Sequence, residues 1–290
     1  MMFDEIRVRA YAKINFGLKV LPRRKDGFHN IESVFQTIDL YDELVINWQK
    51  DKNCLVQCNS MNLPLKNTLT IAYEAFCEIT RIDVPGIKVD LIKGIPSGGG
   101  LGGGSSDAAA LIRALQEVTG ITLSESELDY IASKTGSDVF FFMHCKEDGK
   151  GCALVSGRGE VIKTIPSRND LVLVLVFPDE SSSTKEAYAL VDEMIAEGKD
   201  VKCPAFEELE QIYMKDISEW TFRNTFTAVI AQKLPSVGNA INELKNVGCC
   251  YAEMSGSGST VFGAFTSELQ AERCCNLLDT SWNCKLVRTI

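Results

Sequence analysis

The sequence lacks the short motifs in which proteins usually bind metals. It contains only two histidines, and none of its eleven cysteines forms a C-x-x-C pair. Structural zinc sites usually place Cys and His ligands a few residues apart. Here two pairs of cysteines are directly adjacent instead, Cys249–Cys250 and Cys274–Cys275. An odd number of cysteines in a chain without a secretion signal is typical of reduced thiols. We therefore expect buried, reduced cysteines and no metal held by protein ligands alone.

Long apolar runs and an excess of positive charge are also missing. The longest apolar stretch is Leu171–Phe177, well short of the roughly 18 residues that a membrane span requires. Charged residues interrupt the first nine positions, so no secretion-signal core is visible. The formal net charge is −9, whereas a sequence-independent nucleic-acid binder needs a basic face. The sequence therefore predicts a soluble cytoplasmic protein with no nucleic-acid partner and no membrane partner.

The length and the hydrophobic content predict two lobes. The chain has 290 residues, of which 45% are hydrophobic, and this is near twice the length of a typical domain. We place the boundary between the lobes near Pro166. Neither a fixed-period repeat nor a low-complexity tail is present.

The pattern of apolar residues predicts a β-rich first part followed by alternating helices and strands. Residues 6–20 alternate with period two, which places Lys13 and Asn15 on the polar face of one long strand or hairpin. Asn67 and Ser124 have the positions of helix N-caps, and Gly120 and Gly136 those of helix stops. The expected strands are 34–40, 43–48, 55–58, 87–92, 171–177, 251–254, 260–265 and 284–288, and the expected helices are about 67–80, 107–119, 124–135, 184–196, 223–233, 236–246 and 267–278.

The most informative feature that is present is a glycine-rich segment, Pro96–Asp107, in which six of the seven residues from 98 to 104 are glycine. Glycine allows backbone conformations that other residues avoid, and it lets a ligand approach the main chain closely. The segment leads directly into Asp107–Leu115, which has a helical pattern. Backbone N–H groups at the start of a helix form a binding site for an anion, usually a phosphate.

Three other interpretations of this segment are weaker. The spacing of Gly98, Gly100 and Gly103 matches a dinucleotide-binding fingerprint, but a second helix follows where that fold needs a second parallel strand. A Walker phosphate loop would have a lysine after the last glycine, and none is present. A flexible linker rarely runs straight into an amphipathic helix. A phosphate loop without its own lysine needs a cation from elsewhere, and Lys13 is the natural candidate.

Two further segments contain candidate functional residues. Asp138 stands between a helix stop and the apolar run Val139–Met143, which should bury its surroundings, so its carboxylate needs a partner such as a lysine to stay ionised. An acid after a helix stop is more often a solvated turn or cap. Met254–Thr260 is a second glycine–serine turn between short strands, and a simple hairpin loop is an equally good interpretation.

Together these segments resemble the GHMP kinases, whose phosphate loop has the pattern Pro-x-x-x-Gly-Leu-Gly-Ser-Ser-x-Ala. The matching segments are Ala10–Asn15, Pro96–Ala109 and Met254–Gly258. Within the family, the blocks Ala12–Leu18, Arg24–Asp42 and Thr135–Val139 are similar to the branch whose substrate is 4-diphosphocytidyl-2-C-methyl-D-erythritol, in non-mevalonate isoprenoid biosynthesis. Two positions depart from the usual pattern, since Tyr11 stands where a proline is common and Phe28 where a tyrosine is common.

The resemblance implies an α+β, two-lobed GHMP kinase fold. Its N-terminal lobe, residues 1–165, would be ribosomal-protein-S5-domain-2-like and would carry the ATP site and the catalytic residues. Its C-terminal lobe, residues 166–290, would be a ferredoxin-like α/β sandwich on the substrate side. The resemblance further implies ATP and Mg²⁺ as cofactors. It does not fix the Mg²⁺ ligands, for which Ser105 and Ser106 are candidates, or the oligomeric state, monomer or homodimer.

Residue roles follow from the same resemblance. Asp138 matches the general base that takes the proton from the 2-hydroxyl of the substrate, and Lys13 matches the catalytic lysine beside it. Phe28 and His29 match the cytosine site, Tyr188 is a stacking partner for its other face, and Asn15 is a polar contact to the substrate. The ATP phosphates would bind to the loop residues Pro96, Ser97, Gly98, Gly99, Gly100, Leu101, Gly102, Gly103, Gly104, Ser105 and Ser106.

Two alternatives stay open at the level of the sequence. The first is a GHMP kinase for another small alcohol, such as homoserine or mevalonate. The segments Asp26–His29 and Asp39–Asp42 argue against it, because they resemble the cytidyl-binding branch. A silent nucleotide-binding regulator would have lost Lys13 or Asp138, and both are present.

Overall fold

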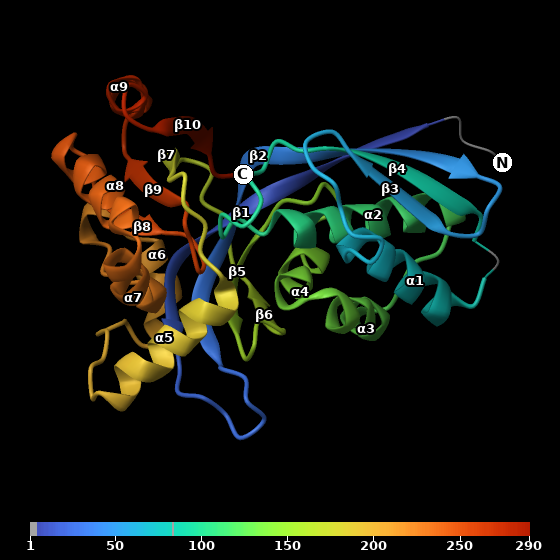
Figure 1. The fold of residues 1–290 in the computed structure, drawn as a ribbon, viewed down its shortest axis with the longest axis horizontal. Helices are drawn as coiled ribbons and strands as arrows, with labels where there is room; N and C mark the ends of the chain where they lie inside the picture. Colours follow the sequence, from blue (N-terminus) through green and yellow to red (C-terminus); the bar gives the residue numbers. More distant parts are fainter. Residues whose placement is uncertain (1–4, 83) are drawn as a thin grey trace. The chain divides into compact units, whose positions relative to one another are not determined.

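The computed structural model describes residues 5–82 and 84–290, which form two compact units whose segments alternate along the chain (Figure 1). The first unit contains the described residues up to Ala12, Leu40–Ser97 and Gly102–Gly151. The second unit contains Lys13–Asp39, Gly98–Leu101 and Cys152–Ile290. The assignment of the ATP site and the catalytic residues to positions 1–165, and of the substrate side to positions 166–290, stays a prediction. No helix in the described part of the chain is both long and apolar enough to cross a bilayer.

Two long strands contribute residues to both units. They are β1 (Ile6–Val20) and β2 (Ile31–Gln49), which pair with each other. The sequence predicted two separate strands, 34–40 and 43–48, and this was wrong because Tyr41 and Asp42 continue the same extended backbone. The sheet that contains β2 has the order β3-β4-β2-β5-β6, with β3 (Cys54–Cys58), β4 (Gly86–Ile92), β5 (Cys152–Ser156) and β6 (Val161–Thr164).

In the first unit, β4 pairs antiparallel with residues Glu43–Gln49 of β2 and parallel with β3. Four helices pack against one another beside these strands (Figure 1). The N-cap predictions at Asn67 and Ser124 are confirmed, because each side chain accepts a hydrogen bond within a capping box. The helices are α1 (Thr68–Thr80), α2 (Gly103–Thr119), α3 (Glu125–Thr135) and α4 (Ser137–Met143).

In the second unit, β5 pairs with Ser33–Gln36 of β2 and with β6. The sequence reading missed this β5–β6 hairpin, although its signals are visible. Cys152–Ser156 is apolar, and the turn after it contains Gly157 and Gly159, both with positive φ. Short helical turns at Phe206–Glu208, α6 (Leu209–Tyr213) and Ile217–Glu219 were also not predicted.

The other sheet of the second unit has four antiparallel strands in the order β10-β7-β9-β8. The chain enters β7, passes through helices to the β8–β9 hairpin, and returns through α9 to β10. This order confirms the predicted ferredoxin-like arrangement, and α8 and α9 pack against the sheet. The elements are β7 (Val172–Phe177), α5 (Thr184–Ala196), α7 (Thr225–Lys233), α8 (Pro235–Asn246), β8 (Tyr251–Met254), β9 (Val261–Phe265), α9 (Glu268–Leu278) and β10 (Asn283–Arg288).

An aromatic cluster forms the centre of the second unit. The ring of Phe16, from β1, lies with its centroid 5.7 Å from Tyr213, 4.8 Å from Trp220 and 5.6 Å from Phe262. The hydroxyl of Tyr213 donates a 2.6 Å hydrogen bond to Gln36 Oε1. Aromatic pairs in such edge-to-face and tilted arrangements stabilise a fold beyond the burial of their area. The packing therefore anchors β1 and β2 to the C-terminal half of the chain.

Candidate active site

The glycine segment needs glycine for two distinct reasons. Gly98, Gly100 and Gly102 have φ angles of 72°, 76° and 72°, in the left-handed region that favours glycine. At Gly100 space is also limiting, because a β-carbon there would lie 2.1 Å from the carbonyl oxygen of Ser255. At Gly98 a β-carbon would meet nothing within 4 Å. The middle of the loop is thus packed against the second glycine turn, whereas its start is open.

A buried polar network in the second unit holds this part of the loop. Lys13 Nζ donates hydrogen bonds to Asn15 Oδ1 at 2.7 Å and to the carbonyl oxygen of Gly100 at 2.9 Å. Ser255 Oγ donates to the same Gly100 carbonyl at 3.0 Å. The sequence placed Lys13 and Asn15 on a half-buried polar face, but Lys13 is only 2% exposed and Asn15 is also buried. The predicted lysine therefore contacts the glycine loop directly.

Asn15 helps to orient this lysine, and its contact to the substrate stays a prediction. Its Oδ1 accepts the hydrogen bond from Lys13, and its Nδ2 donates to Ser33 Oγ at 3.2 Å. The ammonium group also lies 4.9 Å from the centroid of the Phe35 ring, which adds a cation–π contact. A buried lysine needs such partners because desolvation disfavours its charge. The geometry thus fixes the lysine side chain.

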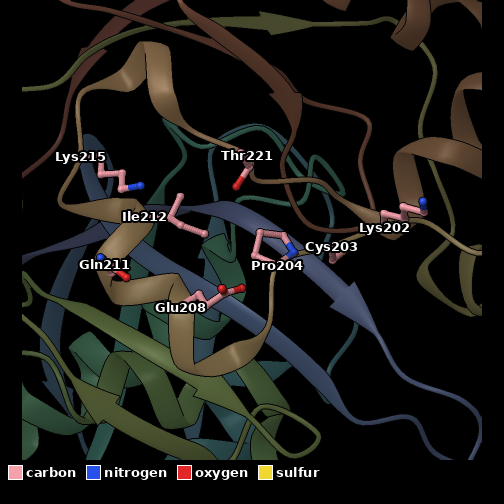
Figure 2. Close-up of a pocket in the computed structure, with 8 residues that line it drawn as sticks. All are labelled: Lys202, Cys203, Pro204, Glu208, Gln211, Ile212, Lys215 and Thr221. Atoms are coloured by element: carbon pink, nitrogen blue, oxygen red, sulfur yellow. The ribbon is translucent and has the colours of Figure 1, made fainter.

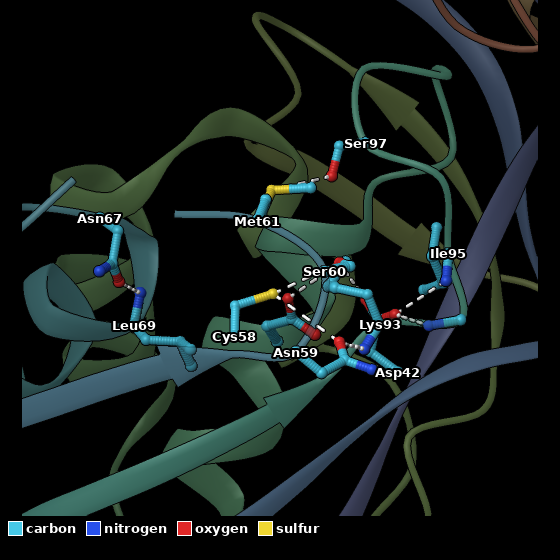
Figure 3. Close-up of polar contacts among 12 residues, drawn as sticks. Asp42, Cys58, Asn59, Ser60, Met61, Asn67, Leu69, Lys93, Ile95 and Ser97 are labelled. Carbon is cyan, nitrogen blue, oxygen red and sulfur yellow. Dashed lines mark hydrogen bonds and ion pairs between the residues drawn. The ribbon is translucent and has the colours of Figure 1, made fainter. Parts of the chain in front are cut away.

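The start of helix α2, in the first unit, lies against a buried charged cluster that the sequence analysis did not identify. Lys93 Nζ forms ion pairs with Asp42 and, at 3.3 Å, with Asp107 Oδ2. Asp42 Oδ1 also accepts hydrogen bonds from the backbone N–H groups of Gly94 and Ile95 at 2.7 and 2.8 Å (Figure 3). A β-carbon on Gly103 would lie 3.1 Å from Lys93 Nζ, so this cluster supports the first turn of the helix.

Charge is not balanced in this cluster, because two carboxyl groups share one lysine. Burial raises the pKa of Asp107 well above its ordinary value, and the nearby Lys93 opposes that rise. Asp42 receives two backbone hydrogen bonds in addition to the lysine, whereas Asp107 Oδ1 is buried without a hydrogen-bond partner. Asp42 is therefore the better stabilised carboxylate of the two.

Ser106 provides a test of whether ATP and Mg²⁺ fit this segment. Its Oγ is buried and lacks a hydrogen-bond partner, on the first turns of a 17-residue helix that follows the glycine loop. An orphaned hydroxyl and the N–H groups of a helix start suit phosphate oxygens. The described residues contain no cluster of three or more His, Cys, Asp or Glu side chains that could hold a metal. The segment therefore fits a phosphate group.

Asp138 lies in the first turn of α4, where the chain leaves α3 through Gly136. All five residues of Val139–Met143 are buried, as the sequence predicted, while Asp138 itself is half-buried. An acidic side chain in the first turn interacts favourably with the helix dipole. The local fold thus keeps this carboxylate at the edge of an apolar region and accessible to a reactant.

His29 is held by two residues of helix α5. Its ring stacks on Tyr188 with a centroid distance of 4.7 Å and an interplanar angle of 17°, and its Nε2 lies 2.8 Å from Asp192 Oδ1. His29 is 7% exposed, whereas Phe28 is 54% exposed, with the Arg158 guanidinium 4.9 Å from its ring centroid. Asp192 was not predicted from the sequence. It is four residues after Tyr188, so both side chains lie on the same face of the predicted helix.

A separate cavity in the second unit contains none of the predicted site residues. It measures about 360 Å³ and is bounded by the chain around Cys203 and by α6 (Figure 2). Figure 2 shows Lys202 and Lys215 at opposite ends of this cavity, so they do not form one cationic site. Its lining residues are Lys202, Cys203, Pro204, Glu208, Gln211, Ile212, Lys215 and Thr221.

The eleven cysteines, all within the described residues, form no disulfide bond, and their exposure varies more than expected. Cys152 and Cys274 are buried, Cys250 is exposed, and the other eight are intermediate. Burial raises the pKa of Cys54 and of Cys145 to about 12. Burial also acts on Cys58, but hydrogen bonds from Ser60 and from the backbone of Met61, with the charge of Lys93, outweigh it and lower its pKa. Figure 3 shows Cys58 beside Asn59 and Ser60.

We expect iodoacetamide at pH 7.5 to label Cys58 before Cys54 and Cys145 in the native protein. The thiolate is the reactive form, and a lowered pKa enlarges its fraction at this pH, whereas a raised pKa reduces it. Mass spectrometry of peptides after short labelling times measures the order. Ser60→Ala removes one stabilising hydrogen bond and should slow labelling of Cys58. Equal rates at all three cysteines would contradict the assignment.

Comparison with known proteins agrees with the resemblance to the GHMP kinases. A family model described as the GHMP kinases N terminal domain matches residues 67–146, and one described as GHMP kinases C terminal matches residues 205–282. The chain is 38% identical, over 98% of both chains, to a protein of Treponema pallidum (strain Nichols) named 4-diphosphocytidyl-2-C-methyl-D-erythritol kinase. The chain belongs to the GHMP kinase family. The matched ranges include α2 with Lys93 and Asp107 of the charged cluster, and helices α7 and α8, whereas Asp42 lies outside them.

Two solved kinase structures have the same fold as this GHMP kinase. A crystal structure of 4-(cytidine 5'-diphospho)-2C-methyl-D-erythritol kinase matches with a TM-score of 0.77 and 27% identity, covering 98% of this chain and 99% of the other. Homoserine kinase from Cytophaga hutchinsonii matches with a TM-score of 0.74 and 18% identity, covering 100% and 96%, and this shows a common fold alone. The predicted α+β GHMP kinase fold is confirmed, and the protein is a small-molecule kinase.

Proposed function

We propose that this GHMP kinase transfers a phosphoryl group from ATP to the 2-hydroxyl of 4-diphosphocytidyl-2-C-methyl-D-erythritol, a step of non-mevalonate isoprenoid biosynthesis. The observation that supports the chemistry best is the buried Lys13, whose ammonium group is bonded to the Gly100 carbonyl of the glycine loop. The substrate is supported by relatives with that name, which align with nearly the whole chain.

The chemistry requires positioning, charge neutralisation and a base for the nucleophile, with little covalent work by the protein. When bound, ATP supplies the phosphoryl group. Asp138 accepts the proton of the 2-hydroxyl as its oxygen bonds to phosphorus and ADP leaves. Lys13 orients the reacting groups and offsets the negative charge that develops on the phosphoryl oxygens. The N–H groups at the start of α2 and the positive-φ glycines hold the nucleotide phosphates.

Mg²⁺ is part of the proposal, held by the nucleotide phosphates with Ser105 or Ser106 as protein ligand. The orphaned Oγ of Ser106 supports this assignment. Mg²⁺ usually keeps several waters and binds through substrate phosphates with few protein ligands. The cytoplasmic location and the absence of nucleic-acid and membrane partners remain predictions from the sequence, which leaves the oligomeric state open between monomer and homodimer.

The experiment that tests the function measures ADP release by the purified protein with four additions. These are 4-diphosphocytidyl-2-C-methyl-D-erythritol, homoserine, mevalonate and buffer alone, each with MgATP. We expect release that depends on the cytidyl substrate. ADP release with homoserine or mevalonate would show that the phosphoryl acceptor is a different alcohol. A folded protein that binds ATP but releases no ADP with any substrate would be a silent regulator.

Phe28→Ala is expected to raise the KM for the cytidyl substrate about tenfold or more with little change in kcat. The reason is that the exposed ring of Phe28 provides a stacking face for the cytosine, as proposed, and base–aromatic stacking is worth about 1–3 kcal/mol. Steady-state kinetics at saturating ATP separates the two parameters. Leu277→Ala, which shortens another exposed apolar side chain of the second unit, is the control. A change in kcat alone would argue against the stacking role.

A further inference from the structure

A buried asparagine that was not predicted from the sequence holds the start of the second glycine turn, Met254–Thr260. Asn224 is 2% exposed, and its Nδ2 donates hydrogen bonds to the carbonyl oxygens of Met254 and Gly256, both at 2.8 Å. A single amide therefore joins two carbonyls that are two residues apart in the turn. This fixes the local backbone more firmly than either bond alone.

Asn224 is itself held by two further hydrogen bonds. Its Oδ1 accepts a hydrogen bond from the backbone N–H of Phe226 at 3.0 Å and so caps helix α7. Its backbone N–H donates to Glu253 Oε2 at 3.2 Å. Glu253 is buried and also accepts hydrogen bonds from Thr227 Oγ1 at 2.6 Å and from the backbone of Met254 at 3.0 Å. A buried polar network in which every member has partners is rigid and specifies one conformation.

The turn that Asn224 holds is in direct contact with the glycine loop of the same unit. Ser255 Oγ donates to the Gly100 carbonyl at 3.0 Å, and the backbone N–H of Thr260 donates to the Gly99 carbonyl at 3.3 Å. A β-carbon on Gly256 would lie 3.0 Å from the Gly100 oxygen. The Gly100 carbonyl thus receives Ser255 from the turn and Lys13 from β1. A shift of the turn would move both the loop and the partner of the lysine.

We propose that Asn224 is a positioning residue for the phosphate loop. Through the carbonyls of Met254 and Gly256 it sets the position of Ser255, and Ser255 sets the Gly100 carbonyl beside Lys13. This inference rests on the proposed function, because it assigns the loop to ATP. Asn224 touches neither reactant, and its effect reaches the nucleotide through the turn.

The test compares a variant that changes only the N–H donors of the Asn224 amide with a control variant at another helix cap. Asn224→Asp keeps an oxygen to cap α7 and removes both N–H donors to the turn. Ser124→Ala removes the N-cap side chain of α3, which should lower the melting temperature of the protein without changing any contact to the loop. Isothermal titration with the ATP analogue AMP-PNP and Mg²⁺ measures the dissociation constant, and thermal unfolding gives the melting temperature.

We expect Asn224→Asp to raise the dissociation constant of AMP-PNP by about tenfold, because two buried carbonyls lose their donor. Ser124→Ala should stay within about twofold of the wild type, even with a similar loss of melting temperature. Wild-type affinity in a folded Asn224→Asp protein overturns the inference. A wild-type protein that does not bind AMP-PNP contradicts the proposed function instead.

A second variant decides the matter if Asn224→Asp does not fold. Ser255→Ala removes the hydroxyl that contacts the Gly100 carbonyl at 3.0 Å and, more weakly, Asn15 Oδ1 at 3.4 Å, and we expect it to weaken AMP-PNP binding in the same direction. Where both variants fold, their effects should not add, since they act along one path, and the double variant should bind about as weakly as Asn224→Asp. Unchanged binding in Ser255→Ala, or simple additivity, would show that the turn does not position the loop.

Discussion

Asp138→Asn is expected to lower kcat by at least about a hundredfold, which is the usual contribution of a positioned general base. Asparagine has nearly the same shape and keeps a polar group at the start of α4, but its amide cannot accept the proton of the substrate hydroxyl. Affinity for AMP-PNP should therefore remain close to that of the wild type. Steady-state ADP release at saturating substrate, together with isothermal titration, separates the two effects.

The matched control for this variant is Asp129→Asn, which makes the same exchange on the surface of the neighbouring helix α3, where Asp129 contacts His144. It should retain wild-type turnover. If Asp138→Asn also turned over within about threefold of the wild type, the proton would go to another group and the role of Asp138 would be misassigned.

Lys13→Met is expected to lower kcat by a similar factor of at least about a hundred, for an electrostatic reason. Methionine fills the buried space of the lysine stem, but it lacks the charge and the N–H donors to Asn15 and the Gly100 carbonyl. The fold should survive, because Ser255 Oγ still serves the same carbonyl. Rate measurements at saturating ATP and substrate test the loss, and circular dichroism tests the fold.

Lys19→Met provides the comparison within the same strand. Lys19 lies further along β1, where it is partly exposed and pairs with Glu32 at 3.3 Å. Exposed pairs of this kind contribute little, so turnover should stay near that of the wild type. A comparable loss in both variants would mean that any charge change on β1 disturbs the protein, and Lys13 would have no special role.

The sequence predicted those parts of the fold that local signals determine. Capping residues at Asn67 and Ser124 and the stop at Gly120 gave helix ends close to the observed ones, because side-chain caps and left-handed glycines act within a few residues. The prediction for β2 was wrong because a polar Asp42 interrupts the apolar pattern. In the structure Asp42 is buried, and Lys93 and two backbone N–H groups compensate its charge.

The family motifs predict site residues such as Lys13 and Asp138, whose roles stay predictions, and no motif points to the residues that act through distant partners. Lys13 lies beside the glycine loop as expected, since the motif specifies both. Asn224, Asp192 and Lys93 are unremarkable in sequence because each has a partner 30 or more residues away along the chain, namely Met254, His29 and Asp42. A capping asparagine before α7 is visible from the sequence, but its second use, holding the turn, depends on tertiary packing.

The sharing of β1 and β2 between the two units has a consequence for biosynthesis. The core of the second unit joins Phe16 to Phe262, and Gln36 to Tyr213, so it cannot close until most of the chain has left the ribosome. Such distant contacts fold slowly, because the entropy of a long loop must be lost before they form. The apolar faces of these two strands therefore stay exposed during synthesis, and a fragment from residue 166 onward should be poorly folded. Chaperone dependence, rather than the stability of the finished enzyme, is expected to limit its yield in cells.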